Sequence, residues 1–376
     1  MDADMACFLH ARLRSAGVDL RLNAKVLGFA EQGGAFTVRT EKGDLPADFA
    51  VLAVGVAPDT ALAAAAGLAT GARGALLVDE HMRTSDKDIY AVGDAVLVRN
   101  AVTGAEGAFA LAGPANRQGR IAADNVCGIP SVYRGAQGSA VLKLFDMTAA
   151  FTGLSERAAK AAGIACDKVV LFSANHATYY PGAQNMTLKV LFRPENGEIL
   201  GAQAVGYAGT EKRIDVLAAA IRAKMTAADL QALDLCYAPP YSSAKDPVNM
   251  AGYVIENVRA GCKQFHWHDL PAVYADKDAQ LLDVRTAAEF AAGHFPQALH
   301  IPVDELRGRM HELDKSKKIY VNCQSGLRSY IACRMLMGEG FDCYNFSGGY
   351  RYYAAVVQDA AAEGVPCHPC GVPVRE

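Results

Sequence analysis

Cys323 lies where an apolar, strand-like run meets a helical stretch, in the segment KIYVNCQSGLRSYIACRML. The N–H groups at the start of a helix have no intrahelical partner and favour negative charge, so a cysteine at such a turn ionises readily to the thiolate that attacks sulfur. Arg328 would add a positive charge, and Gly326 would permit the left-handed backbone that turns loop N–H groups inward. These residues allow a nucleophilic Cys323, with Gln324, Ser325 and Ser329 as further side-chain donors, and leave open a buried strand-end thiol beside a solvated Arg328.

A second pair of thiols lies near the C-terminus. Cys367 and Cys370 have C-x-x-C spacing and enclose His368. Two thiols at this spacing can form half of a zinc site or a redox pair. No second pair with ligand spacing occurs in the sequence, so no metal site is predicted. We expect a frayed, solvent-exposed tail, with a relay thiol for persulfide as the alternative.

Three regions must position these residues. Residues 261–376 alternate strand-like and helical runs in a βαβα order, which predicts a parallel sheet. Residues 138–260 have the pattern of an α+β unit, in which helices are expected over 211–222 and 226–233. Residues 1–137 have the pattern of part of an α/β layer.

The first region, residues 1–137, contains two predicted helices and several predicted strands. Helices are predicted over 2–17 and 117–128. Strands are predicted over 18–22, over 25–40 with a turn at Gly33-Gly34, over 48–56 as a buried strand, and over 88–95 ending on Asp94.

Composition restricts the classes of partner. A formal net charge of −3 gives no electrostatic reason to expect nucleic acid or an acidic membrane surface, so small molecules are the expected partners. No apolar run could span a bilayer, and the N-terminal segment lacks the apolar core of a signal peptide. We therefore expect a cytoplasmic protein. Its ten cysteines are then expected to be reduced thiols, most of them small core residues.

The C-terminal region resembles the single-domain rhodanese family. The resemblance is carried by LLDVRTAAEFAAGHFPQALHIP, YVNCQSGLRS and FSGGYRYY, in the family's order and spacing. It implies that Cys323 takes a sulfane sulfur as a persulfide and passes it to an acceptor, with Arg328 and the 324–327 backbone as the anion cradle. It also implies that Asp283 and Arg285 are a structural charge pair behind the loop.

Loop length separates two chemistries of this fold. Four residues lie between Cys323 and Arg328, whereas related dual-specificity phosphatases have five residues between the cysteine and the arginine of a larger phosphate loop. The smaller ring suits a sulfur atom. A catalytically silent binding module, with Cys323 as a buried strand-end thiol, is the alternative, and retention of the cysteine argues against it.

Two earlier segments resemble the pyridine nucleotide-disulfide oxidoreductases. TSDKDIYAVGDA is similar to their C-terminal flavin motif, and DFAVLAVGVAPDT to the strand that closes their NAD(P) domain. The resemblance implies FAD and NAD(P)H as cofactors, with Asp94, flanked by Gly93 and Ala95, on the ribityl chain of FAD. That family opens with two glycine-rich fingerprints and a redox cysteine, and this sequence contains no G-x-G-x-x-G after a strand. By this resemblance Met1 falls where the NAD(P) domain is already half finished, as in an N-terminally truncated member.

A third block narrows the resemblance to the coenzyme A-disulfide reductase and NADH oxidase branch, which includes members with a C-terminal rhodanese domain. It consists of SANHATYYPGA and LDLCYAPPYSSAKDPVNMAGYVIEN. The resemblance implies a homodimer in which the hydroxyls of Tyr179 and Tyr237 lie near the reactive sulfur of the partner subunit.

The expected fold class is therefore mixed α/β and α+β. A partial NAD(P)/FAD-binding domain would occupy 1–137, a dimerisation domain 138–260, and a rhodanese domain with its C-terminal tail 261–376.

The leading hypothesis is the C-terminal portion of an FAD-dependent reductase of coenzyme A disulfide, persulfide or polysulfide, fused to a sulfurtransferase that can use donors such as thiosulfate. One alternative is a sulfurtransferase alone, with the flavoprotein region as a dimerisation scaffold. Another is a non-catalytic module that binds sulfur species or anions.

Overall fold

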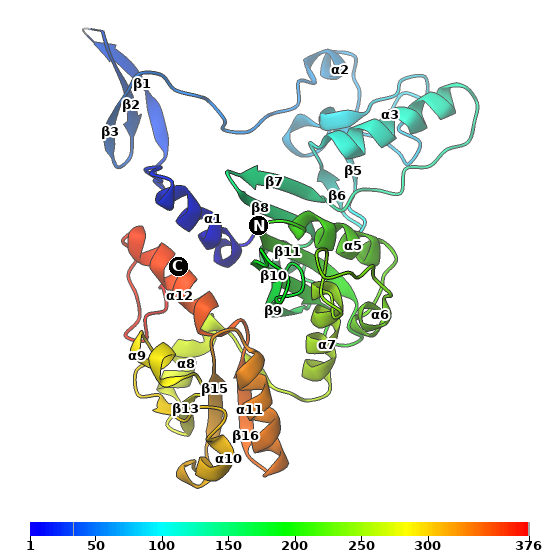
Figure 1. Ribbon diagram of the computed structural model, residues 1–376. Coiled ribbons are helices and arrows are strands. Elements are labelled where there is room, and N and C mark those ends of the chain that lie inside the picture. The colour runs from blue at the N-terminus through cyan, green and yellow to red at the C-terminus, as the bar shows by residue number, and fades with distance from the viewer. Residues whose placement is uncertain (33, 375–376) are drawn as a thin grey trace. The chain divides into compact units, whose positions relative to one another are not determined.

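A computed structural model describes residues 1–32 and 34–374 (Figure 1). Contacts divide the chain into two compact units. The first unit consists of Met1–Arg12, Ala101–Thr103 and Gln137–Glu376, and the second of Leu13–Asn100 and Gly104–Ala136. Within the described part of the chain, every helix is too short or too polar to span a lipid bilayer.

The second unit contains two small sheets. An antiparallel meander is formed by β1 (Val26–Gln32), β2 (Ala35–Thr40) and β3 (Gly43–Ala47). The predicted hairpin over 25–40 is confirmed, although position 33 of its turn lies outside the described residues. The other sheet has the order β4-β5-β6 and joins β4 (Leu76–Leu77), β5 (Val96–Arg99) and β6 (Glu106–Ala108). Its helices are α2 (Ala61–Ala65), η1 (Ala72–Gly74), η2 (Gly93–Ala95) and α3 (Ala112–Val126).

Three predicted strands in this unit are wrong. Residues 18–22 and 48–56 contain no strand, and 48–56 is an extended, exposed segment in which the side chain of Val54 is 89% exposed. A continuous apolar run is typical of a strand buried between parallel neighbours, and no such neighbour is present among the described residues. Residues 88–95 form only an isolated bridge at Tyr90, because the backbone turns into η2 at Gly93 before β5 begins.

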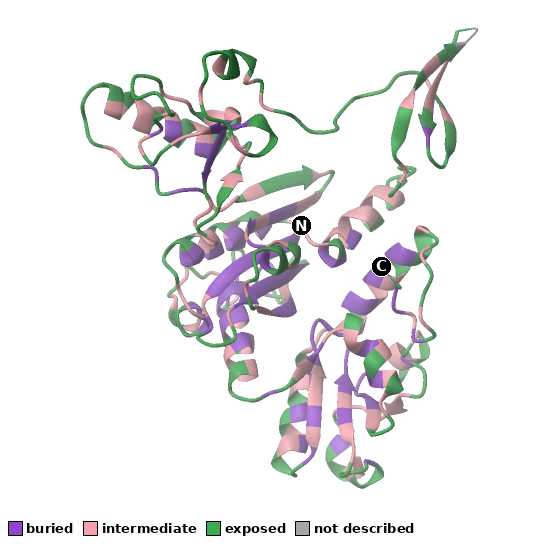
Figure 2. Ribbon diagram, turned by 180° about the vertical axis from the view of Figure 1, so that it is seen from behind, coloured by how far each residue is buried: buried purple, intermediate pink, exposed green. Residues whose placement is uncertain are grey.

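The first unit is built on an antiparallel sheet. Its strand order is β7-β8-β11-β10-β9. The strands are β7 (Ala140–Leu144), β8 (Met147–Gly153), β9 (Asp167–Ala174), β10 (Asn185–Phe192) and β11 (Ile199–Gly206). The predicted α+β pattern is therefore confirmed, and the sheet holds the purple, fully buried strands in the middle of Figure 2.

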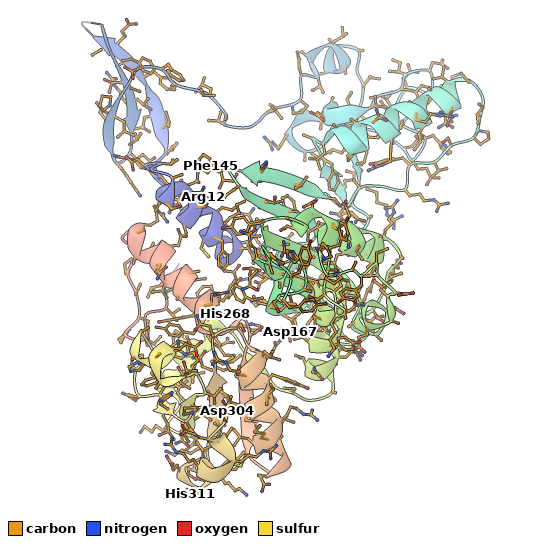
Figure 3. The ribbon with its side chains drawn as sticks, viewed as in Figure 1. Arg12, Phe145, Asp167, His268, Asp304 and His311 are labelled. Atoms are coloured by element: carbon orange, nitrogen blue, oxygen red, sulfur yellow. The ribbon has the colours of Figure 1, made fainter. Side chains whose placement is uncertain are left out.

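Helices cover this sheet. The helices of this part are α4 (Glu156–Ala161), α5 (Thr210–Arg222), α6 (Ala227–Ala232) and α7 (Pro247–Arg259). Apolar residues of α5, α6 and α7 form one large core with the sheet. A separate cluster joins β8, β9 and β11 to α1 (Ala3–Ser15) and to α12 (Gly349–Ala362), through Met5 and Tyr352. Arg12 of α1 also lies over the ring of Phe145, with 5.2 Å from its Cζ to the ring centroid (Figure 3).

A buried charge cluster fastens α1 to the same sheet. The Lys189 side chain is fully buried, and its Nζ lies 2.8 Å from Asp4 Oδ1 and 3.1 Å from Asp2 Oδ2 and also pairs with Glu156. Burial alone would raise the pKa of Asp4, but the Lys189 ammonium holds it below its usual value. Burial alone would lower the pKa of Lys189, but the carboxylates of Asp4, Glu156 and Asp2 raise it.

The C-terminal part of the first unit is a parallel sheet with helices around it. Its strand order is β12-β16-β15-β13-β14. The strands are β12 (Gln264–Phe265), β13 (Ala279–Asp283), β14 (Leu299–His300), β15 (Lys318–Asn322) and β16 (Asp342–Phe346). The helices are η3 (Trp267–Asp269), α8 (Leu270–Ala275), α9 (Ala287–Ala291), α10 (Leu306–Arg309), η4 (Met310–Glu312), α11 (Leu327–Gly338) and α12. The predicted βαβα order is confirmed.

Candidate active site

Cys323 follows directly on β15, and the next turn leads into α11. Its side chain is fully buried. The backbone N–H of Gly326 donates to Sγ at 3.1 Å, and the hydroxyl of Ser329 donates to Sγ at 3.2 Å. Both donors favour negative charge on the sulfur, which is what a thiolate or a persulfide anion requires.

The loop is held from the opposite side by the start of α12. The N–H of Tyr350 donates to the carbonyl of Cys323 at 2.8 Å, and the N–H of Arg351 donates to the carbonyl of Gln324 at 3.1 Å. Gly326 has φ 98°, a left-handed conformation that glycine adopts without a steric cost. Because the loop carbonyls are bound by α12, the N–H groups that follow them are free to turn toward the sulfur.

Gly349 sits against this loop. A Cβ atom built there would lie 2.6 Å from the Cys323 carbonyl oxygen and 2.6 Å from Ser325 N, and its φ is +64°. Only glycine fits this position. The adjacent glycines Gly348 and Gly349 therefore allow the start of α12 to lie against the backbone of the Cys323 loop.

We expect Gly349→Ala to lower sulfur transfer by about 100-fold, because the methyl group displaces the loop that positions Sγ. Gly364→Ala is the matched control, since Gly364 has φ +67° and nothing within 4 Å of its Cβ position. Both variants carry the strain of a left-handed alanine, about 1–2 kcal/mol, but only the methyl group of Gly349→Ala displaces the Cys323 loop. Steady-state kinetics and thermal unfolding of the two proteins measure the difference, and equal losses in both would refute this role.

Asp283 and Arg285 form a buried ion pair beside the loop. Arg285 Nη2 lies 2.7 Å from Asp283 Oδ2, and Arg285 Nη2 also donates to the Gly293 carbonyl at 2.7 Å. The guanidinium carbon lies 4.1 Å from the centroid of the Tyr350 ring, and Nη1 reaches Gln324 Oε1 at 3.4 Å. The pair thus connects the end of β13 to the loop and to the start of α12.

Arg328 is paired rather than turned onto the sulfur. Its Nη1 and Nη2 donate to the two carboxylate oxygens of Glu289 at 2.8 and 2.7 Å. The hydrogen bonds from Arg328 lower the pKa of Glu289 to about 2, and the Glu289 carboxylate in turn raises the pKa of Arg328. The cation beside the loop is therefore paired with one carboxylate and held in a fixed position at the start of α11.

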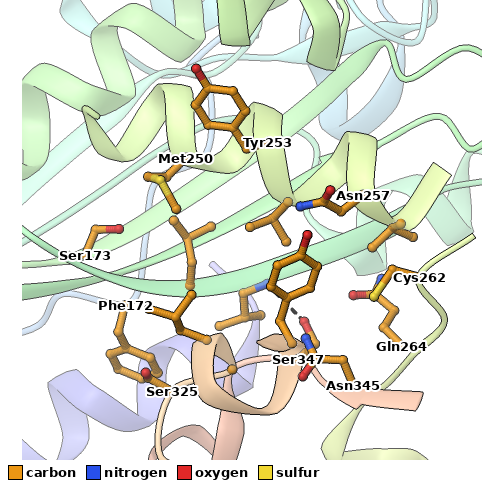
Figure 4. Close-up of a pocket in the computed structure, with 18 residues that line it drawn as sticks. Phe172, Ser173, Met250, Tyr253, Asn257, Cys262, Gln264, Ser325, Asn345 and Ser347 are labelled. Carbon is orange, nitrogen blue, oxygen red and sulfur yellow. Dashed lines mark hydrogen bonds between the residues drawn. The ribbon is translucent and has the colours of Figure 1, made fainter. Parts of the chain in front are cut away.

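An apolar cavity adjoins the loop. Its volume is about 180 Å³, and Ser325, Gly326 and Leu327 form part of its wall. Most of the remaining wall comes from β9 and α7, and residues of α11, β12 and β16 and of the segments next to β12 and β16 complete it (Figure 4). The Oδ1 atom of Asn345 is buried without a hydrogen-bond partner. The cavity therefore has largely apolar walls directly behind the Cys323 loop, and the buried amide of Asn345 adjoins it.

Tyr179 and Tyr237 come together although 58 positions separate them in the chain. Their hydroxyls are 2.8 Å apart, and both side chains are exposed. The hydrogen bond with Tyr179 raises the pKa of Tyr237. The two residues form one polar feature on the surface of the dimerisation region.

Asp94 lies in η2 beside an open cavity in the second unit. Gly93 has φ 82°, and its N–H donates to Gln118 Oε1 at 2.7 Å. Asp94 and Ala95 line a cavity of about 850 Å³ together with residues 54–59. The structure thus brings together the two segments that resemble the flavin and NAD(P) motifs.

Comparison with known families decides the relationship. Residues 1–119 match the family model of pyridine nucleotide-disulphide oxidoreductases, and residues 139–247 match the model of their dimerisation domain. The chain belongs to the pyridine nucleotide-disulphide oxidoreductase family. Residues 267–355 match the rhodanese-like domain.

Several proteins of this family resemble the chain. It is 34% identical over 239 residues to the NAD(P)H sulfur oxidoreductase (CoA-dependent) of Pyrococcus abyssi, covering 64% of this chain and 53% of that protein. It is 32% identical over 256 residues to the coenzyme A disulfide reductase of Staphylococcus haemolyticus, and the match covers 67% of this chain and 57% of that protein. The chain thus spans little more than half the length of these curated relatives.

Solved structures cover more of the chain. The reduced CoADR-RHD of Bacillus anthracis has a TM-score of 0.92 and 42% identity, covering 96% of this chain and 64% of that one. A NAD-dependent persulfide reductase from A. fulgidus has a TM-score of 0.85 and 39% identity, and the match covers 94% of this chain and 64% of that one. The fold class with flavoprotein, dimerisation and rhodanese parts is therefore confirmed.

The pyridine nucleotide-disulphide oxidoreductase family implies FAD and NAD(P)H. In this chain Asp94 offers an exposed carboxylate at a cavity, which suits a hydroxyl of the ribityl chain. The sequence has no glycine-rich strand–helix turn that could cradle a pyrophosphate, and residues 48–56 are not part of a sheet. The described residues supply one side of such a site and do not by themselves enclose a dinucleotide.

Sequence reasoning missed two features of the rhodanese loop. It gave no role to Gly349, whose contact with the loop is long-range, and it did not pair Arg328 with Glu289. The doubled glycine after β16 was the available signal for the first, since adjacent glycines often mark a close backbone approach.

Proposed function

We propose that Cys323 carries sulfane sulfur as a persulfide and transfers it to an acceptor thiol. The observation that supports this is a buried sulfur that receives hydrogen bonds from Gly326 N–H and the Ser329 hydroxyl. The Cys323 thiolate attacks the outer sulfur of the donor, the donor S–S bond breaks, and the remainder of the donor leaves as an anion. An acceptor thiolate then removes the terminal sulfur and regenerates the Cys323 thiolate.

Donors and acceptors belong to this proposal. Thiosulfate, polysulfide and the persulfide of coenzyme A contain the sulfane sulfur that this reaction transfers, whereas the disulfide of coenzyme A is a substrate proposed for the reductase part alone. The apolar cavity of about 180 Å³ behind the loop suits an organic thiol with an apolar stem. A cytoplasmic location is also part of the proposal, because all ten cysteines are free.

We further propose that the flavoprotein part serves NAD(P)H-dependent reduction of coenzyme A disulfide, persulfide or polysulfide in a homodimer. The match of 139–247 to a dimerisation domain supports the dimer, and the Tyr179–Tyr237 pair is the proposed contribution to the disulfide site. Domain boundaries at 137/138 and 260/261 are consistent with the gaps between the matched ranges.

A second candidate is sulfur transfer alone, with the flavoprotein part as a scaffold. The exposed segment 48–56 favours it, because this stretch is not part of a sheet that could close a dinucleotide site. Absorbance of the purified protein at about 450 nm separates the two, since bound flavin absorbs there and the polypeptide does not.

The persulfide itself is the direct test of the first proposal. After incubation with thiosulfate, the intact protein should gain about 32 Da, one sulfur atom, and peptide mapping should place it on Cys323. A non-catalytic binding module would show no gain with any donor.

Arg328→Met should raise the KM for thiosulfate about tenfold with a smaller change in kcat, because it removes the cation beside the loop and leaves the Glu289 carboxylate to repel an anionic donor. Arg334→Met is the matched control, since Arg334 is exposed on the same helix, α11. The KM of an uncharged donor should change less than that of thiosulfate. An unchanged KM for thiosulfate would remove Arg328 from the site.

A further inference from the structure

The last described residues form an ordered clip rather than a frayed tail. In this C-terminal clip, residues 365–374, Val374 N–H donates to the Pro366 carbonyl at 2.8 Å and His368 N–H to the Val372 carbonyl at 2.8 Å. Gly371 N–H closes a turn on the His368 carbonyl at 2.7 Å. The prediction of a frayed tail is therefore wrong.

The clip is anchored through Cys370. That residue is only 3% exposed and packs with Val372 in an aromatic cluster. The Tyr353 hydroxyl donates to the Cys370 carbonyl at 2.7 Å, and a Cβ at Gly371 would lie 2.2 Å from that hydroxyl, so only glycine fits there. Cys367, three residues earlier, remains exposed. The two thiols thus differ in access.

His368 is the partner of the buried thiol. Its Nδ1 accepts the backbone N–H of Cys370 at 3.2 Å and lies 3.0 Å from Cys370 Sγ. Because Nδ1 accepts the backbone N–H, it carries a lone pair, and the S–H of Cys370 is the donor toward it. Burial raises the pKa of the Cys370 thiol, so a nearby base is needed if that thiol is to react.

These three side chains are not arranged as a metal site. Among the described residues, the one group of three or more potential ligand atoms that converge is Asp2, Asp4 and Glu156, and Lys189 Nζ already pairs with each of these carboxylates. Cys367, His368 and Cys370 do not converge in this way. C-x-x-C spacing is also that of redox-active cysteine pairs.

We propose that Cys367 and Cys370 form a second thiol–disulfide exchange site, separate from Cys323, whose substrates are low-molecular-weight organic disulfides. The Cys367 thiolate attacks one sulfur of R–S–S–R, that bond breaks, and RS⁻ leaves, which gives a mixed disulfide at Cys367. Cys370 then attacks Cys367 Sγ while its proton passes to His368 Nδ1, and the second RS⁻ leaves. The substrate gains two electrons and the cysteine pair becomes a disulfide, which an excess of thiol reverses. This chemistry requires neither Cys323 nor a flavin.

The test uses the full chain carrying Cys323→Ser, with glutathione disulfide as the probe. After acid quenching and alkylation, peptide mass analysis should find an internal Cys367–Cys370 disulfide. Cys370→Ser should instead trap glutathione on Cys367, and Cys367→Ser should leave Cys370 unmodified. His368→Ala should slow closure of the internal disulfide about tenfold or more and let the mixed disulfide accumulate.

Cys127 is the control within the same molecule, because it is an exposed thiol outside the clip. We expect it to form a mixed disulfide that never resolves internally. The proposal is overturned if Cys367 carries only the mixed disulfide in the presence of Cys370. It is also overturned if the Cys367–Cys370 disulfide forms in the His368→Ala protein at the same rate as in the protein with His368. Since Cys323 is absent from the test protein, failure here would leave the sulfurtransferase proposal untouched.

Discussion

Cys323→Ser is expected to reduce sulfur transfer by roughly 1,000-fold or more while the protein stays folded. A serine hydroxyl remains protonated at neutral pH and cannot hold a sulfane sulfur, but it can still accept the hydrogen bonds from Gly326 and Ser329. Sulfur transfer from thiosulfate to cyanide or to a thiol measures the loss, and intact mass measures the missing persulfide.

Cys127→Ser is the matched control for that variant, because it removes an exposed thiol from the same chain. It should keep full sulfur transfer. Sulfur transfer that survives in Cys323→Ser, with the control unchanged, would end the assignment of the nucleophile.

Lys189→Met is expected to lower the free energy of unfolding by about 3–5 kcal/mol, because it leaves the buried Asp4 carboxylate without its direct ion pair. The side chain is fully buried and contacts Asp2, Asp4 and Glu156. Lys143→Met is the control, since Lys143 is exposed on β7 of the same sheet. Chemical denaturation followed by circular dichroism gives both values.

The pH dependence of the same variant has a definite sign. In the native protein the pKa of Asp4 is lowered, so its stabilising contribution is present above the unfolded pKa and is lost as pH falls through the folded pKa. Without Lys189, burial is expected to raise the pKa of Asp4. The ionised Asp4 carboxylate then destabilises the folded protein, and this cost disappears when the carboxylate is protonated. The Lys189→Met protein should then become more stable as the pH falls from about 7 to about 4. Over the same range the stability of the native protein should stay unchanged or decrease. A parallel pH profile in both proteins would contradict this account of the cluster.

The sequence pattern predicted the Cys323 loop because its determinants are local. A β-branched strand, one glycine and a helix start lie within a dozen residues around Cys323, and backbone geometry follows from such short patterns. The contacts that complete the loop are long-range. Tyr350 and Gly349 approach it from another helix, and Glu289 pairs with Arg328 across 39 positions.

The wrong predictions have a related physical cause. Residues 48–56 have the composition of a buried strand, but a strand forms only when neighbours accept its hydrogen bonds, and pattern alone does not supply them. The sequence favours a frayed tail at the C-terminal clip, because no second pair of thiols with ligand spacing accompanies Cys367 and Cys370. Its order comes from Tyr353 and from the close approach at Gly371, which no local pattern reveals.

The exposed segment over 49–56 also affects how the chain behaves in solution. Its sequence FAVLAVGV carries no charge, and Val51, Leu52 and Val54 are each at least 70% exposed. Uncharged, β-branched segments with unpaired backbone groups are the usual starting points for strand addition between molecules. The same residues that resemble an interior strand therefore give this polypeptide an intrinsic tendency to aggregate, which increases with protein concentration and which any surface that covers the segment would suppress.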